Sequence, residues 1–281
     1  MAAILRDTSA AALAAAIDAN QAAQFGLLAE CMGGETHDEP DALWFLTGSA
    51  YALFNGVMRA RLPVGRSDAR IGELLSPFRA RGLAMTWHVG TSSEPDDLGI
   101  QLQQQGLWRE LGEPGMAAQL EQLPADRRWV AGLKVLPVRD EARFGVWLEV
   151  MARGFEMPAV ARDGIGVACR RFGFTPGGAM RHYLGLLHEQ PVAASTLFLA
   201  EGVAGIYNVA TLPRARRRGI GAALTLAPLL EARDEGYAIG VLQSSKMGLN
   251  VYWRLGFRPY TRIVQYVLHP DAPFTGVPFP G

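Results

Sequence analysis

Four arginines and two glycines between residues 214 and 221 form the segment with the clearest chemical potential. The arginines stand at positions 214 and 216–218, and the glycines at 219 and 221. Apolar residues before them predict a strand over 203–212, ended by Pro213 because proline has no N–H to donate. Small and apolar residues after them continue at helical spacing. A helix N-terminus has unpaired N–H groups and partial positive charge, so the segment predicts an anion site suited to a pyrophosphate.

This segment matches neither of two common phosphate loops. No Lys-Ser/Thr pair follows the glycines, and the dinucleotide fingerprint lacks its third glycine. The residues from Arg216 to Gly221 do match Arg-x-x-Gly-x-Gly, with Pro213 upstream. That pattern resembles the acetyl-CoA-binding motif of the GNAT superfamily of N-acetyltransferases. Taken alone, it is also compatible with a capped surface turn whose arginines are solvated.

A second motif lies downstream. The apolar run 237–243 predicts a buried parallel strand, after which a serine can cap a short helix that a glycine ends. GNAT proteins typically carry Asn/Ser-x-x-Ala/Gly-x-x-x-Tyr-x-x-x-Gly-Phe in this place. The residues at those positions are Ser245, Gly248, Tyr252, Gly256 and Phe257. Two motifs in the family's order make the resemblance specific, and it covers residues 128–268.

The resemblance implies an N-acetyltransferase that uses acetyl-CoA as cosubstrate and in which a small-molecule amine attacks the thioester directly within a ternary complex. Tyr252 is the implied general acid near the sulfur, with an aromatic packing role as the alternative. Main-chain groups around Val209 and Thr211 would pair with the pantetheine arm, and Arg216 would position the loop as much as contact the phosphate. The remaining residues expected at the cofactor are Arg217, Arg218, Gly219, Ile220, Gly221, Ala222 and Ser245.

The sequence does not identify a general base. Many GNAT relatives carry a glutamate on the strand before the loop, but residues 205–211 offer only Tyr207, Asn208 and Thr211. None of these side chains is a good base at its ordinary pKa. A structural or solvated role is favoured for the other candidates, which are His182, Glu149 and Glu156, and a water chain is a further alternative.

The elements around the motifs predict an α/β (α+β) fold with a mixed sheet. Expected helices cover 140–153 and 158–171, and the remaining expected strands cover 129–136, 182–187, 192–199 and 258–268. Pro228 lies inside the helix that follows the loop, so we expect that helix to bend or to be short. The order of these elements is also the order of the GNAT fold.

The first half repeats two landmarks of the second. Pro63 and Pro213, like Gly106 and Gly256, lie 150 positions apart, with an arginine three residues after each proline. Equal spacing favours an internal duplication over a chance match, and therefore tandem GNAT-like domains. The first half is expected to be a degenerate copy that cannot hold the cofactor. Its residues at the positions of Gly219, Gly221 and Tyr252 are Ala69, Ile71 and Leu102.

The expected domains are 1–125 and 126–268, joined by a linker at 124–128 and followed by an extended proline-rich tail, 269–281. Within the first domain we expect a helix at 10–32, a loop at 33–40, a hairpin region at 43–61, a helix at 71–81 and a strand at 83–89. Asn55 is expected in a turn and His88 in a structural role.

Composition narrows the class of protein. The chain has 27 basic and 27 acidic side chains, so net charge gives no argument for binding nucleic acid or an anionic membrane. Its two cysteines, Cys31 and Cys169, provide neither a disulfide framework nor metal-ligand spacing. Cys169 is expected to be a small buried residue. Without a signal peptide or membrane span in the pattern, a cytoplasmic location is expected.

Two further functions remain open. A non-catalytic CoA-binding sensor or scaffold is the alternative, because the strand glutamate is missing and the first half is degenerate. Acylation of a protein or peptide N-terminus is a weaker option. The acceptor amine, the acyl length and the oligomeric state do not follow from the sequence.

Overall fold

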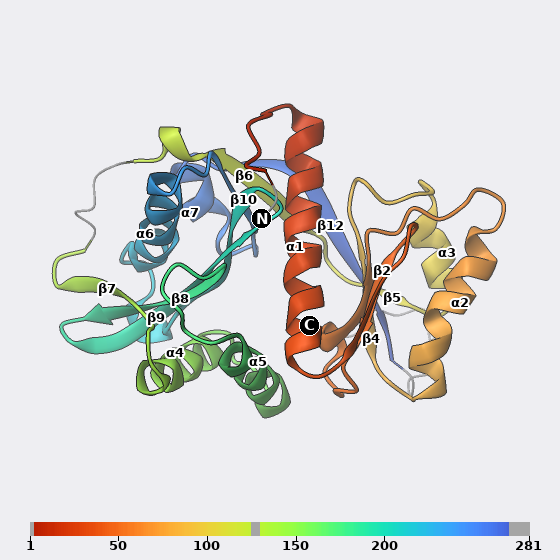
Figure 1. The fold of residues 1–281 in the computed structure, drawn as a ribbon, viewed down its shortest axis with the longest axis horizontal. Helices are drawn as coiled ribbons and strands as arrows, with labels where there is room; N and C mark the ends of the chain where they lie inside the picture. Colours follow the sequence, from red (N-terminus) through yellow and green to blue (C-terminus); the bar gives the residue numbers. More distant parts are fainter. Residues whose placement is uncertain (1–2, 125–129, 270–281) are drawn as a thin grey trace. The chain divides into compact units, whose positions relative to one another are not determined.

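The computed structural model describes residues 3–124 and 130–269, and it divides into two compact units (Figure 1). Unit 1 comprises Met1–Asn20 and Gly115–Tyr260, and unit 2 comprises Gln21–Pro114 and Thr261–Gly281. Each unit is therefore discontinuous in sequence. The division differs from the contiguous one expected, 1–125 and 126–268, because the last strand of each half of the chain pairs within the other unit.

Unit 1 is built on a six-stranded mixed sheet in the order β6-β11-β10-β9-β8-β7. Strands β10 and β11 are parallel, and the other neighbours are antiparallel. The strands are β6 Glu113–Gln119, β7 Leu133–Pro137, β8 Met180–Leu187, β9 Gln190–Ala200, β10 Val203–Thr211 and β11 Ile239–Gln243. The helices that follow the expected order are α4 Glu141–Gly154, α5 Ala159–Phe172, α6 Ile220–Asp234 and α7 Leu249–Arg254.

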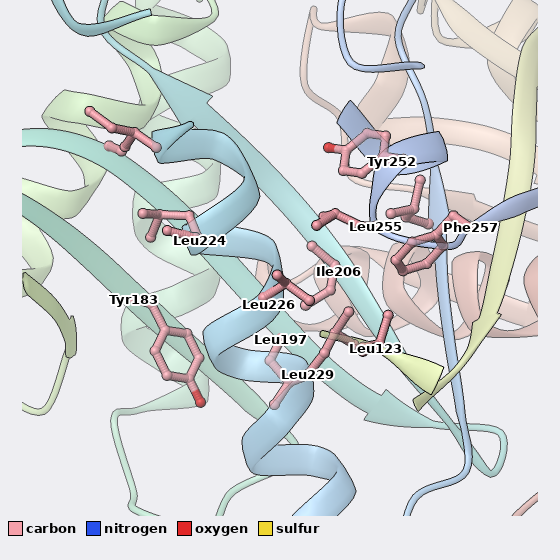
Figure 2. Packing of buried hydrophobic residues seen from close by; sticks show 14 of the residues in the cluster. Leu123, Tyr183, Leu197, Ile206, Leu224, Leu226, Leu229, Tyr252, Leu255 and Phe257 are labelled. Atoms are coloured by element: carbon pink, nitrogen blue, oxygen red, sulfur yellow. The ribbon is translucent and has the colours of Figure 1, made fainter. Parts of the chain in front are cut away.

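Helices α4 and α6 cover opposite faces of this sheet. On β8, His182 packs against the Trp147 ring of α4, whereas the next residue, Tyr183, lies in the core cluster formed with α6. Neighbouring residues of a strand point to opposite faces. Figure 2 shows the α6 side, where Leu224, Leu226 and Leu229 pack toward the sheet and α7.

Helix α6 runs for fifteen residues through Pro228, so of the two expected effects, a bend or a shorter helix, the shorter helix is excluded. Pro228 is buried, and its neighbours Leu229 and Leu230 are fully buried. Tertiary packing of this apolar helix outweighs the one donor that the proline removes.

Unit 2 repeats the same strand pattern in the order β1-β2-β3-β4-β12, with β3 and β4 parallel. The short strand β5, Trp108–Arg109, pairs with β12. The strands are β1 Glu35–Asp38, β2 Leu43–Leu46, β3 Asn55–Met58, β4 Met85–Val89 and β12 Arg258–Leu268. The helices are α2 Ser67–Ala80 and α3 Leu98–Gln104. The shared pattern confirms the tandem arrangement.

Helix α1, Ala10–Cys31, contributes residues to both units. Its residues up to Asn20 belong to unit 1, where Asn20 is fully buried. The Asn20 amide donates to the Ala200 carbonyl at 2.9 Å and accepts from the Tyr207 hydroxyl at 2.7 Å. This amide therefore ties the N-terminal segment to β9 and β10.

Two boundaries in the first half differ from expectation. The segment expected to be a loop at 33–40 contains β1, whose polar residues pair antiparallel with β2. An edge strand needs no apolar alternation, and His37 is held instead by stacking on Trp44 at 3.8 Å. Helix α2 begins at Ser67, four residues before the expected start.

The other expected elements agree with the structure to within a few residues. The start of the strand expected at 129–136, most of the linker at 124–128 and the tail beyond His269 lie outside the described residues. Among the helices described, none is both long enough and apolar enough to traverse a bilayer.

Candidate active site

The loop between β10 and α6 has an unusual backbone. A short 3-10 turn, Pro213–Ala215, is followed by Arg217 with a φ of +61° and Gly219 with a φ of +81°. Gly219 is the N-cap of α6 in the left-handed conformation that glycine adopts without strain. Left-handed residues in such a turn are typical of backbone nests that bind anions.

The N-terminus of α6 offers donors rather than an internal cap. Its N-cap residue has no side chain, and its first turn has no acidic residue. A Cβ added at Gly221 would have Thr211 Oγ1, at 3.8 Å, as its nearest neighbour among the described residues. Internal packing therefore does not require this glycine. The space in front of it suits a phosphate that approaches the helix N–H groups.

Arg216 anchors the loop. Its Nε donates to the Thr211 carbonyl at 3.0 Å, and its Nη2 donates to the Gly154 carbonyl at 2.9 Å. Both partners are main-chain oxygens, one at the end of β10 and one at the end of α4. Arg217 and Arg218 are exposed beside it. The anchored arginine fits the expected positioning role, and the two exposed ones are placed to meet an anion.

Strands β10 and β11 separate before they reach the loop. Within the described residues, their parallel register joins Ala204 to Gly240 and Gly205 to Val241, while β10 continues to Thr211. Between Tyr207 and Ala210 the pairing of β10 with β9 shifts by one residue, which is a β-bulge. The main-chain groups around Val209 and Thr211 are therefore outside the ladder with β11, as pairing with a pantetheine arm requires.

The corresponding junction in unit 2 is closed. Beyond the parallel register of β3 and β4, the Leu62 N–H donates to the Glu94 carbonyl, and the Glu94 N–H donates to the Ala60 carbonyl, each at 3.0 Å. These hydrogen bonds join the segments that follow β3 and β4, whereas the corresponding strands of unit 1, β10 and β11, separate.

At the N-terminus of α2, the helix that follows this closed junction, the chain's own side chains take the place that a phosphate would need. Asp68 stands in the first turn of α2 and accepts a hydrogen bond from Gln105 at 2.8 Å, while Ile71 is fully buried in the core. A carboxylate of the chain itself thus occupies the first turn, where α6 offers space for an external anion. Unit 2 has the features of a degenerate copy.

Tyr252 lies on α7 and is 9% exposed, with its ring edge-on to Phe257 at 6.0 Å. In Figure 2 its hydroxyl points away from Leu255 and Phe257. A Cβ at Gly248 would lie 2.8 Å from the Tyr252 ring, so this glycine makes room for the tyrosine. The Ser245 hydroxyl accepts from the Gly248 N–H at 3.2 Å and caps the start of α7. The second motif thus has a packing basis, and the acid role of Tyr252 stays a prediction.

The side chains considered as general bases lie in surroundings that favour structural or solvated roles. Burial raises the pKa of Tyr207, whose hydroxyl donates to Asn20. Burial lowers the pKa of His182 to about 3, and the ring lies 4.3 Å from that of Trp147. Glu149 is exposed and 4.0 Å from Arg153, and Glu156 is exposed after α4. In the part of the chain that the structure describes, no carboxylate stands on β10.

The residues expected to be structural have that role. Asn55, expected in a turn, is instead the first residue of β3. It is fully buried and bonds the Thr47 N–H and the carbonyls of Ser49 and Ala84, which organises the segment before β3. His88 is buried against Phe25, and burial lowers its pKa to about 4. Cys169 is buried on α5.

Sequence reasoning missed three residues behind the site: Asn20, Trp147 and Thr196. A lone asparagine in the alanine-rich helix at 10–32 was the one available signal, because an amide on an apolar helix needs partners when buried. The other two are an aromatic on an amphipathic helix and a threonine on a strand. Neither pattern indicates more than core packing.

Comparison with known proteins identifies the fold. A family model described as "FR47-like protein" matches residues 183–266. Similar solved structures include a GCN5-related N-acetyltransferase from Kribbella flavida, with 18% identity, a TM-score of 0.72, and coverage of 92% of this chain and 96% of that chain. Another, from Sphaerobacter thermophilus, has 15% identity, a TM-score of 0.59 and 95% coverage of both chains.

A tandem GNAT protein from the clavulanic acid biosynthesis pathway is also similar, with 15% identity and a TM-score of 0.55 over 83% of this chain and 79% of that chain. Comparison with curated protein sequences returned no match. The chain therefore has a tandem GNAT-type fold: the two sequence motifs predicted the GNAT fold, and the repeated landmarks predicted the tandem arrangement.

Proposed function

From this tandem GNAT-type fold, in which one unit has an open strand junction, we propose that the protein is an acetyl-CoA-dependent N-acetyltransferase with one cofactor site, in unit 1. The observation that carries the proposal is the combination in unit 1 of an open junction between β10 and β11 with the uncapped N-terminus of α6. The closed junction at Glu94 in unit 2 supports a single site.

The pyrophosphate would lie against the N–H groups of residues 217–222, with the exposed Arg217 and Arg218 adding charge-assisted hydrogen bonds. The pantetheine arm would pair with the main chain of Val209 and Thr211, which lie beyond the ladder that joins β10 and β11 within the described residues. Acetyl-CoA would supply the activated thioester. The chain's task is then to orient the thioester and exclude water around it.

The acceptor would be the neutral amine of a small molecule, which attacks the thioester carbonyl directly. A proton must leave the attacking nitrogen and another must reach the departing thiolate. The hydroxyl of Tyr252 is proposed to supply the second. No carboxylate stands on β10 within the described residues. Water would therefore accept the proton of the attacking nitrogen, or the acceptor would bind already as its neutral amine.

Turnover tests this proposal. Purified protein is screened with acetyl-CoA and a panel of primary amines, and release of free CoA is measured. We expect at least one amine to give turnover that Gly221→Ala lowers about tenfold or more, because the added Cβ enters the space for the phosphate.

Gly72→Ala is the matched control, since Gly72 is also in the first half of a helix and has open space around it. Both changes should leave the helices intact, as alanine favours helix. Binding of acetyl-CoA without turnover of any amine would favour the alternative, a CoA-binding sensor or scaffold, which the missing carboxylate on β10 also suggests. Absence of both binding and turnover would contradict the proposal.

A further inference from the structure

The bulge in β10 depends on one residue with a strained backbone. Tyr207 pairs with Thr196 and Ala210 with Ala194, so Asn208 and Val209 both lie opposite Ser195. Asn208 has a φ of +53°, in the left-handed region that side-chain-bearing residues seldom occupy. Asparagine tolerates this region best, but a conformation of this kind persists only where its surroundings hold it.

A line of side chains across three strands supplies that support. The Asn208 amide donates to Thr196 Oγ1 at 3.2 Å, and Thr196 Oγ1 lies 3.0 Å from His182 Nδ1. Thr196 is cross-strand partner both to Tyr207 on β10 and to His182 on β8. Thr196 is fully buried and His182 is 2% exposed, so water cannot readily replace either partner.

The direction of these hydrogen bonds follows from their chemistry. The Asn208 amide nitrogen can only donate, so Thr196 accepts there and its own proton is available for His182 Nδ1. His182 can accept this proton only as the neutral ring. Burial among Phe144 and Trp147 favours that form by lowering the pKa of His182 to about 3. Thr196 Oγ1 and His182 Nδ1 are then both paired, while the protonated Nε2 of His182 is buried with no hydrogen-bond partner among the described residues.

Helix α4 supports the strand opposite the bulge. The Trp147 indole N–H donates to the Ser195 carbonyl at 3.0 Å, and both groups are buried. Ser195 is the residue that the two bulged positions share as a neighbour, because the register skips it. A bulge disrupts the ladder locally, and the indole gives the Ser195 carbonyl a hydrogen-bond donor at this point.

We infer that Thr196, His182 and Trp147 are positioning residues that hold the β10 bulge, and thereby keep the main chain of Val209–Thr211 in the geometry that binds the pantetheine arm. The inference rests on the proposed function, because it gives these buried groups a role in cofactor affinity. It also reassigns His182, a candidate base by sequence, to a role that acts through Thr196 and Asn208.

The test is calorimetric titration of acetyl-CoA into the full chain and its variants. Thr196→Val keeps the shape and removes the hydroxyl, and we expect it to raise the Kd for acetyl-CoA about tenfold. Thr196→Ser restores the hydroxyl, and we expect a Kd within about threefold of the wild type. Thr86→Val, at an equally buried threonine of unit 2, is the matched control and should leave the Kd unchanged.

Steady-state kinetics separate positioning from general destabilisation. We expect Thr196→Val to raise KM for acetyl-CoA and leave kcat at saturating cofactor close to the wild-type value. Unchanged Kd in Thr196→Val, with wild-type protein that binds acetyl-CoA, would overturn the inference and leave the proposed function standing. Wild-type protein that binds no acetyl-CoA would instead refute the proposed function and this inference with it.

A second pair of variants decides the matter if Thr196→Val does not fold. Asn208→Gly keeps access to the left-handed backbone, whereas Asn208→Ala does not. We expect the alanine variant to bind acetyl-CoA about tenfold more weakly than the glycine variant. Equal affinity of the two variants would show that the bulge conformation does not control binding, and would contradict the inference.

Discussion

Tyr252 combines a packing role, which its ring fulfils, with the proposed acid role, which needs its hydroxyl. Removal of the hydroxyl oxygen therefore tests the acid role alone. Its ring fits the space left by Gly248 and packs against Phe257, so Tyr252→Phe should retain the fold. We expect this variant to lower kcat about 10²- to 10⁴-fold, the contribution typical of a general acid, with little change in KM for acetyl-CoA. Steady-state CoA release measures both values.

Tyr266→Phe is the control for this prediction. Tyr266 is buried to a similar degree in unit 2, where it pairs with β4 and β5, so the same deletion of a hydroxyl should not alter kcat. A Tyr252→Phe variant as active as the wild type would assign the hydroxyl no part in the proton transfer.

Arg216 provides a second prediction at the scale of single residues. Arg216→Met removes two charge-assisted hydrogen bonds to the carbonyls of Thr211 and Gly154. Since each such bond contributes about 1.5–3 kcal/mol, we expect the Kd for acetyl-CoA to rise at least about tenfold. The exposed Arg214 gives the control variant, Arg214→Met, for which we expect a change below about threefold. Equal effects of the two variants would mean that general charge, rather than loop anchoring, governs binding.

At the scale of elements, local pattern identified most helices and strands because their apolar spacing is strong. Helix α4 has a capping Asp140 and a buried face, and both motifs lie at the ends of β10 and β11 as expected. The polar edge strand β1 and the start of α2 escaped detection. Their pairing and length depend on neighbours such as β2 and the Gln105–Asp68 hydrogen bond, which have no local signal.

The sequence likewise predicts one part of the candidate site and not the other. The anion loop and Tyr252 could be found because they lie in short stretches of sequence with characteristic spacing. The support behind the loop could not, because Asn208, Thr196 and His182 come from three strands and are joined only by register. Hydrogen bonds of this kind follow from the folded sheet and not from local spacing.

Protonation of His88, on strand β4, should make the stability of the protein depend on pH. Burial lowers the pKa of His88 from 6.5 to about 4, so the unfolded chain takes up the proton first as the pH falls. The contribution of His88 to stability is therefore complete above pH 6.5 and is lost between that pH and about 4. At pH 5 the loss is about 2 kcal/mol.

His88→Leu removes this titration. We expect the decrease in Tm between pH 7.5 and pH 5 to be smaller in His88→Leu than in the wild type, by roughly 4–8 °C. Met85→Leu is the control, because Met85 is a fully buried residue of the same strand without a titratable group and should leave the decrease unchanged. An identical decrease in wild type and His88→Leu would show that His88 does not titrate in this range.

At the scale of the whole molecule, the described residues contain two copies of one strand pattern, with an open junction in unit 1 and a closed one in unit 2. The predicted duplication captured the shared order of elements, and the tandem fold confirms it. The pairing of β6 in unit 1 and of β12 in unit 2 could not be predicted, since each strand would have suited either sheet by its composition. Only long-range pairing determines which sheet a terminal strand completes.

Opening the second junction would require more than one substitution. In unit 2, the main-chain bonds between Glu94 and residues 60–62 close the junction, Asp68 occupies the first helical turn and Ile71 fills the core. These features act together against a phosphate at the N-terminus of α2, and we therefore propose one acetyl-CoA site per chain, in unit 1.

The stoichiometry and location of acetyl-CoA binding test this central claim most directly. Isothermal titration of the full chain with acetyl-CoA is predicted to show one site per chain, which Gly221→Val abolishes and Gly72→Val, its matched change in unit 2, preserves. Two sites per chain, no binding, or a single site that survives Gly221→Val would contradict the account.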